Sequence, residues 1–467
     1  MSRAFCIAVS CALAAHAANA DAQPRTDPTA GRAVFTGATT PNATSIELNP
    51  AALDLGKNDE GYVAVTGVID QLAIHTRTLD LMSGTLSPGP DVSTTTLAPG
   101  GMAAYVWHIQ RIATLGFDLA SVPVAAAPSG MAALQYHELA LRERTYSGAI
   151  AASVRISDDI LFGASISDNL RHLHLRYARD VALAQGHGPL ADPQNTEIVD
   201  VDVHQTSLFS SENLRVNLGL VVQVVKDVFV GVAYHTVPGV DSVTNAYTGN
   251  MVVQPAPAGG GGLARGGAEV IVSEPASVDG EIRARLPAQL DLHVGVRWED
   301  LSRFTAYDVR GYGTALTEIG EPEWTLRPLG YHDPVAVWAG VEQIDLGDVT
   351  PWRFGARIGA QKSAVPDAAT SPLAVAPLSF TADVGVQLRV PYVPWVVQLT
   401  YGVQYFPTVH VANSVFDPRD AIDCAASGYD YSTQACASTR NGYAIDTAAG
   451  DYSRWEHAIR ISLRYEH

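Results

Sequence analysis

The chain has 467 residues, of which 47% are hydrophobic, and its 30 Lys and Arg residues against 48 Asp and Glu residues give a formal net charge of −18. An acidic balance of this size argues against nucleic-acid binding, which needs a basic face. After the first twenty residues, no segment approaches the roughly 18 consecutive apolar residues that a transmembrane helix requires.

The first twenty residues have the features of an export signal. Arg3 supplies a positive charge, residues 4–15 are mostly apolar, and Ala18-Asn19-Ala20 fits a cleavage site of small residues. We therefore expect a signal peptide over 1–20. In the alternative, Cys11 is the acylated cysteine of a lipoprotein, but the apolar stretch before it would then be very short.

From residue 60 onward the sequence alternates with the period of a β-strand. In 290–298, leucine, valine and tryptophan occupy the even positions, and the odd positions hold Asp291, His293, Gly295 and Arg297. Segments 214–224 and 454–465 show the same pattern. Such segments, apolar on one face and polar or small on the other, are typical of membrane-spanning strands, although a soluble sandwich also alternates.

The connections between these segments distinguish a barrel from a sandwich. Short turns such as Ser157-Asp158-Asp159, Val225-Lys226-Asp227 and Asp300-Leu301 are predicted to alternate with long links such as 79–100, 181–198, 248–283 and 414–451. This asymmetry is typical of outer-membrane barrels, which must close because lipid leaves no backbone amide unpaired. We predict an all-β, transmembrane antiparallel β-barrel of about 14 strands, near 61–78, 101–109, 112–122, 144–157, 159–180, 199–224, 227–247, 284–299, 302–311, 332–345, 350–362, 376–390, 394–413 and 452–466.

Aromatic residues near the predicted strand ends fit the girdles that such barrels place at the two membrane interfaces. The alternative is that they are ordinary core residues. The residues concerned are Tyr105, Trp107, Tyr177, Tyr234, Trp298, Trp352, Trp395 and Tyr465.

The remaining chemistry is sparse. Cys424 and Cys436 lie close together, which in an exported protein favours a disulfide within one loop. His172 and His174 lie two apart on one strand, and we assign them to a wet lumen face rather than to a metal site. We expect no metal, no cofactor and no enzymatic activity, because no nucleophile elbow or phosphate-binding glycine loop is present.

Several short motifs follow one another in an order that identifies a family. Gly31-Arg32-Ala33, Gly37-Ala38 and Asn49-Pro50-Ala51 stand between the signal peptide and the first strand, and Arg285-Leu286-Pro287 and Ser363-Ala364-Val365-Pro366 follow later. Together they resemble the FadL family of outer-membrane transporters for long-chain fatty acids and aromatic hydrocarbons.

The resemblance implies a fourteen-stranded barrel, residues 59–467, plugged by an N-terminal hatch, residues 21–58. It implies passive, hatch-gated uptake of a hydrophobic small molecule, a fatty acid or a hydrocarbon, with release sideways between strands. Gly31, Arg32, Ala33, Gly37, Asn49, Pro50 and Ala51 would then shape the hatch, with Arg32 pairing with a lumen carboxylate. Pro123 would interrupt strand pairing at the lateral opening, or would simply end its strand.

The predicted location is the outer membrane of a Gram-negative bacterium. There we expect a monomer in contact with lipid and lipopolysaccharide, and with no nucleic acid. Two alternatives remain at this stage: a general porin for polar solutes, and a structural or adhesive barrel whose 414–451 loop forms a binding surface.

Overall fold

The computed structural model describes residues 34–80, 85–109, 112–122, 139–181, 193–205, 208–210, 213–237, 245–287, 289–322, 324–343, 351–372, 375–412 and 445–466. Within these ranges nineteen strands join in one antiparallel sheet. None of the helices in the same ranges is long and apolar enough to cross a membrane.

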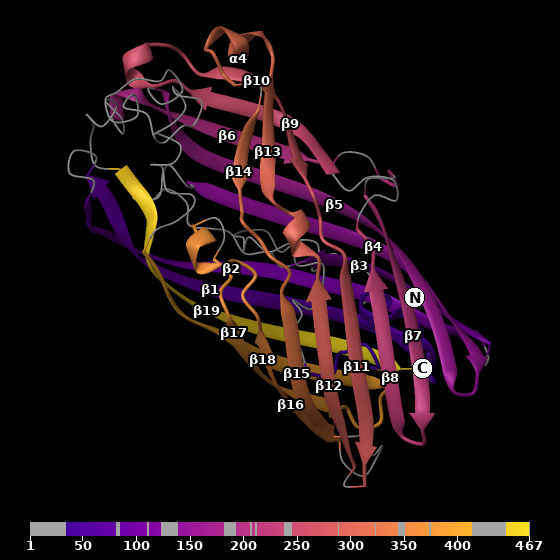
Figure 1. The fold of residues 1–467 in the computed structure, drawn as a ribbon. Coiled ribbons are helices and arrows are strands. Elements are labelled where there is room, and N and C mark those ends of the chain that lie inside the picture. The colour runs from indigo at the N-terminus through magenta and orange to yellow at the C-terminus, as the bar shows by residue number, and fades with distance from the viewer. Residues whose placement is uncertain are drawn as a thin grey trace.

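Fourteen of the described strands close into a ring (Figure 1). Each pairs with the next strand of the ring, and β1 closes it by pairing with β19, from Glu60 opposite Glu466 to Leu79 opposite Ile445. The predicted antiparallel barrel is therefore confirmed. In ring order the strands are β1 (Glu60–Asp80), β2 (Thr85–Ile109), β3 (Ala113–Val122), β4 (Ala140–Ser157), β5 (Ile160–Asp180), β7 (Leu214–Val225), β8 (Val228–His235), β11 (Ser277–Leu286), β12 (Leu290–Glu299), β15 (Val335–Gln343), β16 (Trp352–Gln361), β17 (Ser379–Arg389), β18 (Trp395–Val411) and β19 (Ile445–Glu466).

The other five strands extend the wall at one end of the ring. The first half of β5 pairs with β7, whereas its second half, from His172 to Asp180, pairs with β6. From there the extension continues in the order β6, β9, β10, β13 and β14, and Figure 1 shows it at the upper end of the molecule. Its strands are β6 (Thr196–His204), β9 (Asn245–Gln254), β10 (Ala264–Val272), β13 (Ala306–Tyr312) and β14 (Thr325–Pro328).

The two ends of the ring differ in their connections. At the turn end, short links join β4 to β5, β7 to β8 and β11 to β12, and both Asp227 and Gln289 adopt positive φ angles of 67° and 62° to make tight turns. Strand β1 begins and β19 ends at this same end. The loop end carries the extension and the short helical elements η3 (Pro193–Asn195), η4 (Pro257–Gly259), η5 (Leu301–Arg303), α4 (Thr314–Glu318) and η7 (Asp367–Ala369).

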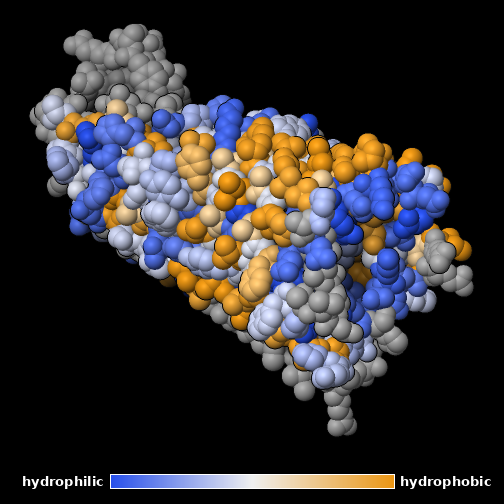
Figure 2. Space-filling model, turned by 90° about the horizontal axis from the view of Figure 1, so that it is seen from below, coloured by the Kyte–Doolittle hydropathy of each residue, from blue (hydrophilic) through white to orange (hydrophobic). Residues whose placement is uncertain are grey.

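Along the ring strands, large apolar side chains point outward and polar or small ones point inward. On β12, Leu292, Val294 and Val296 are exposed, whereas Asp291 and His293 are buried. Figure 2 shows hydrophobic side chains gathered over much of the flank of the molecule. A wall of this kind matches a hydrocarbon solvent outside and a polar lumen inside.

Four of the eight predicted girdle residues are exposed on the outer surface. Trp107 and Trp352 are exposed near the turn end, and Tyr234 and Trp298 are exposed where the ring meets the extension. The prediction is wrong for Tyr177, which is 1% exposed because it points inward from β5.

The prediction that His172 and His174 face the lumen is wrong. They alternate with the buried Leu173 and Leu175 and lie on the outer side of β5, where their ring nitrogens approach Asp202 and Asp200 at 2.6 and 2.9 Å. Within the described ranges, no three His, Cys, Asp or Glu residues are arranged to hold a metal ion.

The number of ring strands was predicted correctly, but not all of their identities. The segment 284–299, predicted as one strand, is a hairpin of β11 and β12 that turns at Pro287, a residue with no amide hydrogen for a strand ladder. The predicted link 248–283 contains β10 and most of β11, and 302–311 belongs to β13 of the extension. Segments 199–224 and 227–247 each combine one extension strand with one ring strand.

Candidate functional site

Residues 34–55, the N-terminal segment, lie against the inward face of the ring. The segment contains a short helix, α2 (Ser45–Leu48), and a 3-10 turn, η1 (Pro50–Leu55), joined by Asn49. The Asn49 side chain accepts a hydrogen bond from the Ala51 amide at 3.1 Å, and Pro50 occupies the first position of the turn, where a missing amide costs nothing. The sequence Asn49-Pro50-Ala51 therefore fixes the local bend of the segment.

Glycines on the ring strands make room for this segment. A Cβ atom on Gly219 of β7 would lie 2.0 Å from the Asn49 side-chain oxygen, and one on Gly163 of β5 would lie 2.3 Å from the Ala51 amide nitrogen. Gly231 of β8 and Gly355 of β16 approach the segment equally closely. Any larger residue at these points would collide with the segment, so the glycines form its seat.

Charged residues of the lumen hold the start of the segment. Glu342 of β15 accepts a hydrogen bond from the Phe35 amide at 2.5 Å, and Glu281 of β11 accepts from both the amide and the hydroxyl of Thr39. His293 of β12 lies between these carboxylates, at 3.2 Å from Glu281 and 3.4 Å from Glu342. We call Glu281, His293 and Glu342 the latch cluster.

Further polar contacts hold the rest of the segment. The Ala43 amide donates to Glu60 at 3.0 Å, and the hydroxyl of Ser153 donates to the Ala51 carbonyl at 3.1 Å. Asp54 forms an ion pair with Arg155 at 3.0 Å. Such contacts fix a buried segment because an amide or carboxylate that loses its partner inside a protein costs about 1–3 kcal/mol.

The predicted site residues fall into two groups. Gly37, Asn49, Pro50 and Ala51 come together within the N-terminal segment, and Gly37 packs on Glu281, whose carboxylate would lie 2.0 Å from a Cβ atom there. Gly31, Arg32, Ala33, Pro123, Cys424 and Cys436 lie outside the described residues, together with the signal peptide.

Sequence reasoning missed the ring side of this site. The four glycines and the latch cluster come from strands far from the segment in sequence; 307 positions separate Phe35 from Glu342. The only signal was the recurrence of glycine and charged residues on the inward face, as at His293 and Gly295, which indicates a polar lumen without indicating what occupies it.

On the loop-end side of the N-terminal segment, the interior becomes apolar. Inward side chains of β4, β5, β6, β9, β10 and β13 form one buried cluster with residues of the connectors around 301–304, 329–331 and 364–376. We call this cluster the apolar chamber. Its members include Leu173, Tyr177, Val201, Tyr247, Met251 and Tyr307.

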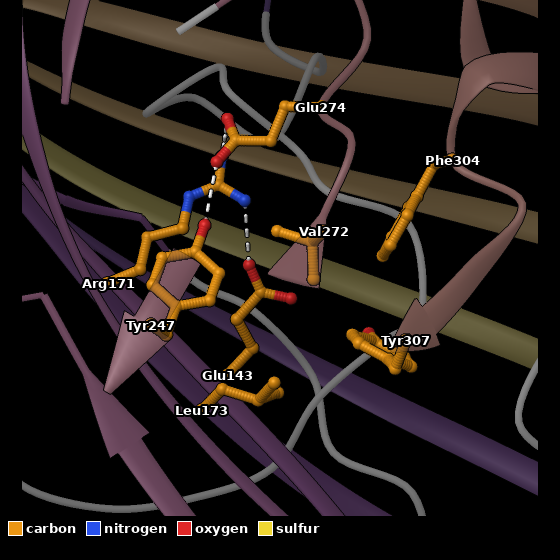
Figure 3. Close-up of a pocket in the computed structure, with 8 residues that line it drawn as sticks. All are labelled: Glu143, Arg171, Leu173, Tyr247, Val272, Glu274, Phe304 and Tyr307. Atoms are coloured by element: carbon orange, nitrogen blue, oxygen red, sulfur yellow. Dashed lines mark hydrogen bonds and ion pairs between the residues drawn. The ribbon is translucent and has the colours of Figure 1, made fainter. Parts of the chain in front are cut away.

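One charged group interrupts the chamber at a small cavity (Figure 3). Arg171 of β5 lies between two carboxylates, at 3.0 Å from Glu143 and 2.8 Å from Glu274, and the Tyr247 hydroxyl donates to Glu274 at 2.8 Å. Leu173, Val272, Phe304 and Tyr307 complete the lining. The cavity measures about 10 Å³, enough for one water, so a larger guest must displace side chains of the lining.

Known proteins resemble this chain in structure, whereas the sequence comparisons find no match. No protein-family model and no curated protein matches the sequence. A Pseudomonas aeruginosa FadL homologue of known structure superposes with a TM-score of 0.73 at 16% identity, over 96% of this chain and 100% of that one. The toluene transporters TodX of P. putida and TbuX of Ralstonia pickettii, at 11% and 15% identity, give TM-scores of 0.59 and 0.57, each over 91% of this chain and 94% of theirs. The resemblance inferred from the sequence motifs is thus confirmed at the level of the fold.

Proposed function

We propose that this chain is an outer-membrane channel for passive uptake of hydrophobic molecules, and not an enzyme. Its apolar outer wall suits the hydrocarbon core of a bilayer. The polar ring interior is occupied by the N-terminal segment, which acts as the plug, and the apolar chamber supplies a surface on which a hydrophobic solute gains free energy as it leaves water. Proteins of similar fold that transport toluene agree with this assignment.

The observation that carries the proposal is the order of these features along the barrel. The chamber lies toward the loop end, and the plug lies beyond it, seated on glycines and held by the latch cluster. A solute that enters from the loop end reaches the chamber first and is stopped by the plug. Onward movement then requires either a shift of the plug or an opening in the wall, for which the segment around Pro123 remains our proposed position.

The plug is the part of the proposal that a deletion tests directly. Removing residues 21–57 from the protein, reconstituted in planar bilayers, should raise ion conductance, because the polar ring interior loses its filling. A barrel with residues 21–57 removed that conducts no more than the intact chain would contradict the plug. Free conduction by the intact chain would favour the general porin instead.

The substrate class needs a separate measurement. The protein should be purified from membranes in mild detergent and extracted, and the retained molecules identified by mass spectrometry. A fatty acid or hydrocarbon in stoichiometric amount is the expected result. Protein that retains no apolar molecule, and that neither binds nor passes added hydrocarbon in liposomes, would refute the transport function.

A further inference from the structure

The cavity in the apolar chamber allows the substrate class to be narrowed, on the premise that the proposed function holds. A fatty acid and an aromatic hydrocarbon are both hydrophobic, but at neutral pH the first carries a carboxylate. The charged groups that line the chamber therefore decide which of the two can be bound.

Each charged side chain in the cavity lining, as far as the structure describes it, already has an ion-pair partner. The two terminal nitrogens of Arg171 are taken by Glu143 and Glu274, and all three side chains are buried, at 6%, 8% and 4% exposed. Arg215 of β7 is also buried, and its guanidinium donates to the carbonyls of Thr236 and Pro275 at 2.8 and 3.3 Å. The cavity lining therefore holds one guanidinium between two carboxylates, and Arg215 is a second buried guanidinium outside that lining.

A substrate carboxylate would disturb this arrangement. In an interior shielded from water, a charge without a partner is strongly unfavourable, and both terminal nitrogens of Arg171 already bind glutamates. A neutral ring meets no such cost, because Leu173, Val272 and Phe304 offer it apolar surface. We infer that the chamber selects neutral hydrophobic molecules and rejects carboxylates, and that Glu143 is the residue that sets this selectivity.

Glu143 is singled out by its contacts. Glu274 accepts hydrogen bonds from Tyr247 at 2.8 Å and from Asn245 at 3.1 Å in addition to its ion pair, so it is held in place by three groups. Among the described residues, the hydrogen bond and ion pair recorded for Glu143 are both with Arg171. Neutralising Glu143 should therefore release one side of the guanidinium while leaving the Glu274 arrangement intact.

A pair of probes with the same ring separates charge from hydrophobicity. Naphthalene is neutral, and 2-naphthoate is naphthalene with one ionised carboxylate at pH 7.5. Binding of each is measured by equilibrium dialysis against the full chain in proteoliposomes, with empty liposomes as the blank. Since the two probes differ in their own affinity for lipid, each probe is compared only with itself between protein variants.

Glu143→Gln is the test variant. It should bind 2-naphthoate at least about tenfold more tightly than the unmodified chain does, as expected when a carboxylate gains a charge-assisted hydrogen bond to Arg171. Naphthalene binding should change less than about threefold. In the double variant Glu143→Gln/Arg171→Gln the gain for 2-naphthoate should disappear.

The control neutralises a glutamate in a similar network outside the cavity. Glu321, which follows α4, pairs with Arg179 of β5 at 2.9 Å and does not line the chamber cavity. Glu321→Gln should leave the binding of both probes unchanged. If Glu143→Gln does not give a heat-modifiable, folded barrel, the smaller Glu143→Ala removes the same carboxylate and should produce the same gain.

The outcomes separate the two proposals. The inference is supported if the unmodified chain binds naphthalene and excludes 2-naphthoate, and if Glu143→Gln binds 2-naphthoate more tightly. If the unmodified chain binds both naphthalene and 2-naphthoate, or if a folded Glu143→Gln variant binds 2-naphthoate no more tightly, the selectivity is overturned. The uptake function is unaffected by either result. Failure of the unmodified chain to bind either probe overturns the uptake function and the inference with it.

Discussion

Asn49 is the residue whose loss should disturb the plug most directly. Its side-chain nitrogen donates to the carbonyl of Ala38 at 2.6 Å and to that of Leu220 at 3.4 Å, and its oxygen accepts from the Ala51 amide at 3.1 Å. One short side chain therefore ties together two parts of the plug and joins them to β7. Asn49→Ala removes all three contacts.

The cost follows from the burial of these groups. Asn49 is 0% exposed, so the carbonyl of Ala38 and the amide of Ala51 find no water when the amide side chain is removed. At about 1 kcal/mol for each of the two shorter hydrogen bonds, and somewhat more for leaving buried partners unpaired, the seated plug loses about 2–3 kcal/mol. Since about 1.4 kcal/mol corresponds to a factor of ten, the population with the plug displaced should rise about 30- to 150-fold.

A buried reporter cysteine measures that population. Thr40 is 8% exposed, and its hydroxyl has no hydrogen-bond partner among the described residues. Thr40→Cys therefore removes no hydrogen bond that the structure describes. In a background without Cys424 and Cys436, the rate at which a polar maleimide labels this cysteine follows the opening of the plug. Asn49→Ala should raise the labelling rate by the factor above.

The matched control is Asn58→Ala, which changes an exposed asparagine just beyond the plug and should leave the rate unchanged. A labelling rate for Asn49→Ala within threefold of the parent, in a barrel shown to be folded, would refute the argument that Asn49 holds the plug.

Three further changes probe the seat, the latch and the wall. Gly219→Val should displace the plug even more strongly than Asn49→Ala, since its Cβ would stand 2.0 Å from the Asn49 oxygen. The same labelling assay measures the effect. A labelling rate for Gly219→Val no higher than that of the parent would mean that the plug adapts to the larger side chain. Glu342→Ala removes the acceptor of the Phe35 amide and one partner of His293. Because one hydrogen bond contributes roughly 1 kcal/mol, the labelling rate should rise tenfold or less. Ile282→Arg places a charge on the outer wall, where Ile282 is 51% exposed, and should lower the free energy of unfolding from bilayers by about 2–4 kcal/mol in urea titrations. An unchanged free energy of unfolding would mean that this position lies outside the hydrocarbon core.

The fold could be predicted from the sequence as far as local patterns reach. The alternation in 290–298 identified an outward apolar face and an inward polar face, and both are present in β12. The motif Asn49-Pro50-Ala51 likewise specifies its own turn, because the cap and the proline act within three residues.

The local pattern does not predict which strands close the ring. Strand β13 of the extension alternates as a ring strand does, so local pattern places 302–311 in the ring. Most of β11 falls inside the predicted link 248–283, although β11 pairs with β8 from Ser277 to Ala284. Alternation records only that each strand has two different environments. The pairing partner depends on residues tens of positions away, as with Ser277 opposite His235.

The candidate site divides in the same way. The alternating wall, the short turns and the bend of the N-terminal segment at Asn49 can be predicted from local sequence, because each depends on neighbouring residues and the backbone geometry that they allow. By contrast, no local pattern indicates that Gly219 receives Asn49, that Glu342 holds Phe35, or that Arg171 is shared by Glu143 and Glu274. Those contacts join distant strands, and only closure of the barrel brings the strands within reach of one another.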